Sequence, residues 1–288
     1  MNRRSFIQQS SIAALAGFAL HCAGETTPQA AETMPVGKQR PHLTTVGLQL
    51  YTLRSIMGED FVGPIRQAAQ IGYKEFEFAG YGDLSAEQIR ALLDELGVRS
   101  PSTHVSAQLI REDLAGLISR SKVIGHEYLI CPHPGELPFK TMDDFKAMAA
   151  KFNEWGKVCK DAGLQFGYHN HSFEFEAIDG ATTLPMDVLL ENTDPDLVAI
   201  ELDLCWAINA GADPIAYFEK YPGRFHLCHV KDLDAAGELA DVGQGRIDFA
   251  PIFAKAQTAG LKHYVVEHDR PSDPIASIRN SYNYLTGA

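Results

Sequence analysis

The sequence predicts an α/β fold in which eight parallel strands, each followed by a helix, close into a single (β/α)₈ barrel. Two observations favour this fold. Amphipathic segments repeatedly end at a glycine and lead directly into a short apolar or β-branched run, which is the order of a parallel βα unit. Eight such runs begin roughly 25 to 40 residues apart, which leaves room for one helix in each crossover. An open, doubly wound sheet is the alternative.

The strands are expected, in chain order, over residues 46–51, 74–78, 98–104, 127–131, 165–171, 198–203, 225–230 and 263–267. A helix that ends in a left-handed residue favours glycine there, and glycines stand one step past the amphipathic segments at positions 72, 97, 125, 163 and 260. The first strand, in GLQLYTLR, is followed by no G-x-G-x-x-G, so a nicotinamide cofactor is disfavoured.

The N-terminus is expected to lie outside the barrel. Residues 1–24 combine Arg3 and Arg4 with the apolar stretch IAALAGFAL, and the run RRSFI resembles the twin-arginine signal that brings folded proteins to the export machinery. Residues 25–43 are interpreted as a linker, and residues 44–288 as the catalytic barrel. The protein is therefore expected to be periplasmic or exported. Two alternatives stay open: residues 1–24 as a disordered cationic tail, and a lipid anchor on Cys22, which His21 disfavours.

Composition narrows the function classes. The chain has 25 basic and 37 acidic residues and a net charge of -12, and no basic cluster follows the N-terminus, so a nucleic-acid surface is not expected. The five cysteines form no C-x-x-C pair, which argues against a zinc ribbon or redox pair. Cys131, Cys205 and Cys228 lie in or beside apolar runs and are expected to be buried. A homodimer is expected only because dimers are the commonest assembly.

The last four strands carry polar side chains near their carboxyl ends, where the active sites of such barrels lie. Side chains two positions apart on a strand share a face. The pairs are His169 and His171, Glu201 and Asp203, His229 and Lys231, and Glu267 and Asp269.

One ligand from each of these strands would form a divalent-metal site made of His169, Asp203, His229 and Glu267. Two imidazoles and two carboxylates suit Mn²⁺, Zn²⁺, Co²⁺ or Fe²⁺, with Mg²⁺ also open, and leave positions for substrate oxygens. The opposite orientation would bury unpaired charges beneath the helices at a cost of several kcal/mol each.

Further residues are expected at the same mouth. His171 is either a fifth ligand, a substrate contact or a packing residue, and Glu201 is interpreted as a support or ion-pair partner behind the ligands. Lys231 either binds a substrate oxygen or forms a surface salt bridge with Asp232. His104 and His133 are candidates for substrate binding or for loop hydrogen bonds.

The remaining candidates are weaker. Gln49 and Glu77 are expected to be mainly structural. Trp206 and Tyr51 could form an apolar wall against a sugar ring, although packing is the more usual role of a tryptophan.

Several motifs in order support a family resemblance over residues 44–286. GYHNHSFEFE, LDLCW, HVKD with VGQGRIDF, and VVEHD together resemble the sugar phosphate isomerase/epimerase family with the xylose-isomerase-like TIM barrel. The resemblance implies a divalent metal held by a Glu, an Asp, a His and a Glu at the ends of strands five to eight. Asp203, His229 and Glu267 match, whereas His169 stands where many members have the first Glu and Trp206 where many have a His. The H-N-H variant is similar to inosose dehydratases and to lyases acting on 3-keto-glycosides.

The expected activity is that of a metal-dependent isomerase or epimerase that removes a proton next to the carbonyl of a keto-sugar through an enediolate. Glu267 is the first choice of base and His169 the second. A lyase or dehydratase acting on 3-keto-glycosides or inososes would share this first step. A metal-dependent endonuclease and a non-catalytic periplasmic sugar-binding protein are further alternatives.

Overall fold

A computed structural model describes residues 38–135, 140–178 and 180–288 of the chain. The expected export signal, with Cys22, lies outside the described residues, and so does the expected linker up to residue 37. Residues of that linker that are described contact the barrel, because the backbone N–H of Leu43 donates to the carbonyl oxygen of Leu285 at 2.9 Å. In the described part of the chain, no helix has both the length and the apolar character needed to cross a bilayer.

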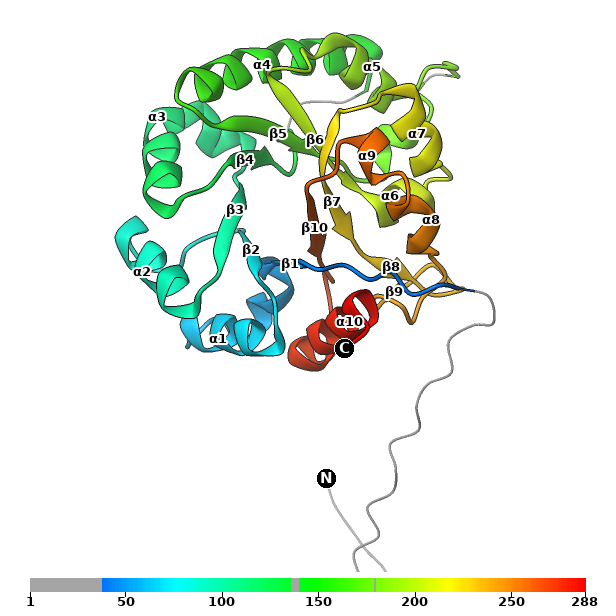
Figure 1. Ribbon diagram of the computed structural model, residues 1–288. Coiled ribbons are helices and arrows are strands. Elements are labelled where there is room, and N and C mark those ends of the chain that lie inside the picture. The colour runs from blue at the N-terminus through cyan, green and yellow to red at the C-terminus, as the bar shows by residue number, and fades with distance from the viewer. Residues whose placement is uncertain (1–37, 136–139, 179) are drawn as a thin grey trace, which may run out of the picture. The chain divides into compact units, whose positions relative to one another are not determined.

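Eight parallel strands form a closed barrel, as predicted (Figure 1). Around the barrel they follow the order β1-β10-β7-β6-β5-β4-β3-β2, so that β1 pairs with both β2 and β10. Each predicted strand is present within a few residues of its expected bounds. The strands are β1 Gly47–Gln49, β2 Glu75–Phe78, β3 Arg99–His104, β4 Tyr128–Cys131, β5 Gln165–His169, β6 Val198–Asp203, β7 Phe225–Val230 and β10 His263–Val266.

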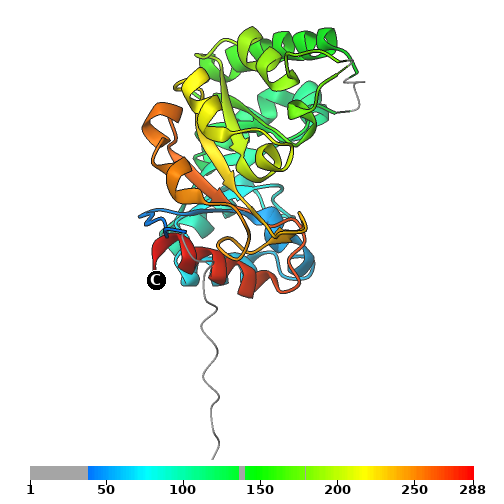
Figure 2. The ribbon, with the colours of Figure 1, turned by 90° about the vertical axis from the view of Figure 1, so that its right-hand side faces the viewer.

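Helices follow the strands and surround them (Figure 1). The longer ones are α1 Val62–Ile71, α2 Ala86–Leu96, α3 Ala107–Ile124, α4 Met142–Asp161, α5 Pro185–Asn192 and α10 Pro274–Thr286. The expected glycine stops are present. Gly97, for example, ends α2 at a φ of 63°, in the left-handed region where a side chain would be strained. Helix α10 packs against α1, which places the last helix beside the first (Figure 2).

The later crossovers contain more elements than the expected single helix. Between β6 and β7 lie two short helices, and between β7 and β10 lie a two-stranded antiparallel hairpin and two further short helices. Short 3₁₀ segments also follow β1 and β5. These additional elements are α6 Leu204–Asn209, α7 Pro214–Lys220, β8 Asp232–Leu233, β9 Leu239–Ala240, α8 Phe249–Phe253, α9 Ala256–Ala259, η1 Leu50–Ile56 and η2 Phe173–Phe175.

An apolar layer fills the middle of the barrel and separates its two ends. Its buried members are Tyr128, Ile130, Ala199 and Leu227. Gly167 on β5 supplies no side chain, and a Cβ there would collide with the Ile130 side chain. Because this layer is closely packed, the charged side chains further along the same strands are confined to the carboxyl end of the barrel.

Gly156 lies where α4 approaches the chain just before β6. A Cβ at this position would lie 2.5 Å from the carbonyl oxygen of Leu197. Alanine is normally favoured over glycine within a helix, but backbone atoms cannot yield as a flexible side chain can. We expect Gly156→Ala to lower the free energy of unfolding by about 1 to 3 kcal/mol in urea titrations. Val158→Ala, on the exposed side of the same helix, should change it by less than about 0.5 kcal/mol; a stabilised Gly156→Ala variant would contradict the packing.

Candidate active site

The innermost polar layer of the barrel mouth joins side chains from five strands. Nε2 of His104 lies 2.6 Å from Oε2 of Glu201, and Nε2 of His229 lies 2.7 Å from Oε1 of Glu77. Gln49 donates from Nε2 to the same oxygen of Glu77 at 2.7 Å. All of these side chains are buried except His104, which is 10 % exposed. Hydrogen bonds across the barrel therefore fix imidazoles and carboxylates against one another.

A second polar layer lies nearer the mouth and centres on Lys231. The Nζ atom lies 2.7 Å from Oε2 of Glu267, 3.0 Å from Oδ2 of Asp203 and 3.3 Å from Oδ1 of Asp269. Burial alone would lower the pKa of Lys231, but the three surrounding carboxylates outweigh it and hold the pKa well above its usual value. Lys231 therefore stays cationic, 5.5 Å from the ring of Trp206.

The alternative of a surface salt bridge between Lys231 and Asp232 is wrong. Lys231 is only 2 % exposed and points into the barrel, whereas the Asp232 carboxylate, fully buried, accepts from backbone N–H groups of the following loop. These donors are Gly243, Gly245 and Ile247, each at 3.0 Å. Neighbouring residues of a strand face opposite sides. Asp232 therefore holds the VGQGRIDF loop in place, whereas the Lys231 side chain points toward the barrel mouth.

The four ligands predicted from the sequence lie close together but do not form one compact group. Two groups of side chains could hold a metal ion: an inner one of His104, His169, Glu201 and His229, and an outer one of Asp203, His229 and Glu267. His229 belongs to both, because its Nδ1 lies 2.8 Å from Oε2 of Glu267 while its Nε2 faces inward. His169 connects them less closely, with its Nε2 3.8 Å from Oδ2 of Asp203.

The chemistry of this cluster suits a divalent cation. Four buried carboxylates, those of Glu77, Glu201, Asp203 and Glu267, face one buried ammonium, so negative charges outnumber positive ones by three when the imidazoles are neutral. Such an excess is costly in a buried site unless a cation or protons balance it. Oε1 of Glu201 is buried without a hydrogen-bond partner among the described residues. Oδ2 of Asp203 lies 3.0 Å from Nζ of Lys231, and Nδ1 of His169 lies 3.2 Å from Oε2 of Glu201. Carboxylate oxygens and imidazole nitrogens of this kind are usual ligands of a divalent ion.

The other predicted substrate contacts lie around the same mouth. His171 and His133 meet edge to face, with ring centroids 5.9 Å apart; His133 is exposed. Burial, assisted by the charge of Lys231, lowers the pKa of His171 to about 4, so this imidazole is neutral at physiological pH. Trp206 is half-buried. The structure thus brings the four predicted ligands, together with His104, Lys231, His171 and Trp206, to one end of the barrel and places His133 at its rim.

Two residues of the GYHNHSFEFE motif support the site from behind, and their roles were not predicted. Asn170 accepts from the backbone N–H of Asp203 at 2.9 Å, which ties the end of β5 to the end of β6. Glu174 accepts from the N–H of His171 at 2.8 Å and from the hydroxyl of Tyr168. Burial raises the pKa of Glu174 to about 7 despite these donors. The motif therefore orients its own histidines.

Glu77 and Gln49 contribute more to the site than their sequence context indicated. Glu77 contacts both His229 and His104, at 2.7 and 3.1 Å, and Gln49 holds it in place. The available signal was weak: two acidic residues alternate in EFEF on β2, which puts both inside the barrel. Cys131, Cys205 and Cys228 are buried, as predicted.

Fold and site together define a (β/α)₈ barrel with a cluster of buried imidazoles and carboxylates at the carboxyl ends of its strands. The family model described as xylose isomerase-like TIM barrel matches residues 65–287, and the chain belongs to this family. This is the family predicted from the motifs.

An inosose dehydratase of Lacticaseibacillus casei is 29% identical over 169 residues, covering 52% of this chain and 54% of the relative. This chain thus spans about half the length of the first curated relatives it matches. A crystal structure of a sugar phosphate isomerase/epimerase from Parabacteroides distasonis shares 27% identity at a TM-score of 0.72, covering 90% of this chain and 98% of that one. The zinc-bound IolI protein shares the fold, at a TM-score of 0.68 and 14% identity, over 84% of this chain and 97% of its own.

Proposed function

We propose that this protein is a metal-dependent enzyme that removes a proton next to the carbonyl of a keto-sugar and thereby isomerises or epimerises it. The observation that carries the proposal is the buried cluster of carboxylates, imidazoles and one ammonium at the barrel mouth. The relatives named as sugar isomerase/epimerase and inosose dehydratase, and the zinc bound by the IolI protein, support it.

Asp203, His229 and Glu267, with His169 beside them, are the residues proposed to hold the divalent ion. Bound there, the ion would act as a Lewis acid on the carbonyl of the substrate. We assign it to this outer group because that group faces the mouth, where a substrate enters, whereas Glu201 lies two residues deeper on the same face of β6. Glu201 then supports the ligands through His104 and His169.

The chain's own residues supply proton transfer and orientation. Glu267 is proposed as the base that takes the proton, and His169, whose Nδ1 lies 3.2 Å from Oε2 of Glu201, is the second choice. Lys231, held in the same layer, would donate to a substrate oxygen as negative charge develops on it. The Trp206 ring beside this ammonium would face one side of the sugar. His104, His133 and His171 are proposed as further substrate contacts.

Elimination is the second candidate outcome. Return of the proton to the neighbouring carbon gives an isomer, and its return to the opposite face of the same carbon gives an epimer. Departure of an oxygen from the next carbon is instead the reaction of a dehydratase or lyase. The several relatives named inosose dehydratase favour this second outcome. Both outcomes share the first step, so one set of residues serves both.

A metal-replacement experiment on the full chain tests the proposal. We expect treatment with a chelator to remove turnover of free ketoses, inososes or 3-keto-glycosides, and one of Mn²⁺, Zn²⁺, Co²⁺, Fe²⁺ or Mg²⁺ to restore it; metal content is measured in parallel. Full activity in the chelated protein would contradict metal dependence. Binding without turnover would favour a sugar-binding protein, and cleavage of abasic DNA would favour an endonuclease.

Export through the twin-arginine route is part of the proposal, and the arginine pair at positions 3 and 4 is what supports it. Such export would bring the folded barrel to extracytoplasmic sugars.

A further inference from the structure

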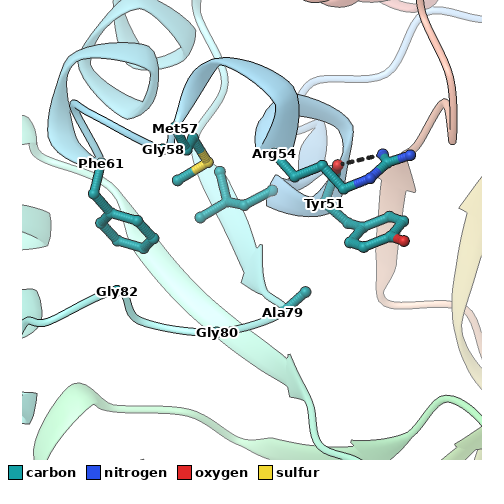
Figure 3. Close-up of a pocket in the computed structure, with 9 residues that line it drawn as sticks. Tyr51, Arg54, Met57, Gly58, Phe61, Ala79, Gly80 and Gly82 are labelled. Atoms are coloured by element: carbon teal, nitrogen blue, oxygen red, sulfur yellow. Dashed lines mark hydrogen bonds between the residues drawn. The ribbon is translucent and has the colours of Figure 1, made fainter.

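An apolar pocket lies between η1, which follows β1, and the loop that follows β2 (Figure 3). It has a volume of about 220 Å³, and its walls include Leu50, Tyr51, Met57, Phe61 and Ala79. In Figure 3 the side chains of Met57 and Phe61 stand over the loop that follows β2, with Arg54 and Tyr51 on the other side. Such a pocket offers dispersion contacts but few hydrogen bonds, so it suits an apolar group rather than a bare polyol.

The pocket lies at the same end of the barrel as the candidate active site, because its lining residues directly follow β1 and β2. Leu50 follows Gln49, whose side chain holds Glu77, and Ala79 stands two residues after Glu77. On the other side, Arg54 donates to the carbonyl oxygen of Asp269, whose carboxylate lies 3.3 Å from the Lys231 ammonium. A ligand whose polar part faces Lys231 could therefore extend into the pocket.

The outer rim of the barrel mouth differs in polarity from one side to the other, although Gln49, Glu77 and His104 on β1 to β3 belong to the polar layer deeper inside. The proposed metal ligands come from β5, β6, β7 and from the end of β10, which are consecutive around the barrel. The opposite arc, β1 to β3, carries exposed apolar side chains just beyond its strands. Tyr51 is 44% exposed, Ile56 38% and Leu109 50%. A substrate that is polar at one end and apolar at the other would match this division.

We propose that the pocket binds a ring-sized apolar substituent of the substrate, as in the aglycone of a keto-glycoside, while the sugar faces Lys231 and Glu267. This inference rests on the proposed function and narrows its substrate class from free sugars to substituted ones. The volume is sufficient, because a cavity of about 150 Å³ already accommodates benzene in another protein. Arg54, whose guanidinium carbon lies 3.9 Å from the centre of the Tyr51 ring, is also part of the pocket wall.

For a 3-keto-glycoside, elimination of the aglycone is a balanced reaction. Loss of the proton on carbon 2 leaves an electron pair that forms the double bond between carbons 1 and 2 as the bond from carbon 1 to the glycosidic oxygen breaks. The aglycone leaves with that oxygen and takes up a proton, so an alcohol and an unsaturated keto-sugar are formed with no oxidant or reductant.

Benzyl and methyl 3-keto-glucosides test the pocket, because their leaving alcohols are of similar acidity and only the benzyl group can fill it. We expect the wild type to prefer the benzyl compound by at least about tenfold in kcat/KM. Ala79→Leu adds bulk at an exposed pocket residue, and Phe61→Ala removes a wall. Both should abolish most of the preference, mainly by raising KM for the benzyl compound. Val158→Ala, on exposed α4, is the control and should keep the preference.

Calorimetric binding of benzyl β-glucoside, which lacks the ketone, separates the two proposals. If neither keto-glucoside turns over but this ligand binds the wild type and not Ala79→Leu, the pocket stands and the proposed function fails. If both keto-glucosides turn over with equal kcat/KM, or if the variants lose both compounds in parallel, the pocket assignment is overturned. If benzyl β-glucoside binds Ala79→Leu as tightly as wild type, the assignment is likewise overturned.

Discussion

His229→Ala is expected to lose its divalent ion and to lower kcat/KM on the order of 10³-fold, since Lewis-acid stabilisation contributes several kcal/mol. His229 is the residue shared by both groups that could hold a metal. Its two nitrogens lie 2.8 Å from Glu267 and 2.7 Å from Glu77, so alanine removes a ligand and disconnects the two polar layers. Metal content by mass spectrometry and the visible absorption of the Co²⁺-loaded protein report binding independently of activity.

His226→Ala is the matched control, because His226 lies on the same strand at the opposite end of the barrel. Its Nδ1 lies 3.3 Å from the Tyr128 hydroxyl, below the apolar layer. This variant should retain a full equivalent of metal. If the His229→Ala protein also retained a full equivalent of metal, the cluster would not be the metal site.

Asp203→Asn and Glu201→Gln distinguish the outer group from the inner one. If Asp203 is a ligand and Glu201 only supports the ligands, metal affinity should fall by at least about 100-fold in Asp203→Asn and by about tenfold in Glu201→Gln. The reverse order would place the ion in the inner group with His104 and His169. Each substitution keeps the shape of its side chain, so the comparison reports mainly the loss of charge.

The barrel was predictable because amphipathic segments that end at a glycine repeatedly lead into a short strand, as at Gly125 before Tyr128–Cys131. The elements added around it were not. The hairpin Asp232–Leu233 with Leu239–Ala240 is very short, and the loop that follows it depends on backbone N–H groups that donate to Asp232. Any residue except proline supplies such a donor, so side-chain patterns do not reveal it.

Some residues of the site could be predicted from the pattern of a single strand, whereas others are brought together only when the barrel closes. Alternation along single strands placed His169, Asp203, His229 and Glu267 on inward faces. The contact of Glu77 with His229, however, joins β2 to β7, which are not neighbours in the barrel and lie 152 residues apart in the chain. Likewise Lys231 found partners on β6 and beyond β10 rather than the adjacent Asp232. Sequence spacing does not contain these distances.

Glu267→Gln is expected to lower kcat by about 10²- to 10⁴-fold at saturating metal, because the amide cannot take the substrate proton. Glu267 is 5% exposed, and its Oε2 lies 2.7 Å from Lys231 and 2.8 Å from His229. An amide oxygen can still accept from Lys231, so the geometry should largely persist, while loss of the negative charge should weaken metal binding in part. Metal titration therefore has to accompany the kinetics.

Proton exchange separates the role of Glu267 as a base from its role as a ligand. In D₂O with saturating metal, the wild type should exchange the proton next to the substrate carbonyl for deuterium, and Glu267→Gln should not. Glu154→Gln, exposed on α4, should exchange at the wild-type rate. Exchange that persists in Glu267→Gln and disappears in His169→Gln would assign the base to His169, the second choice. Glu267 would then act mainly as a metal ligand.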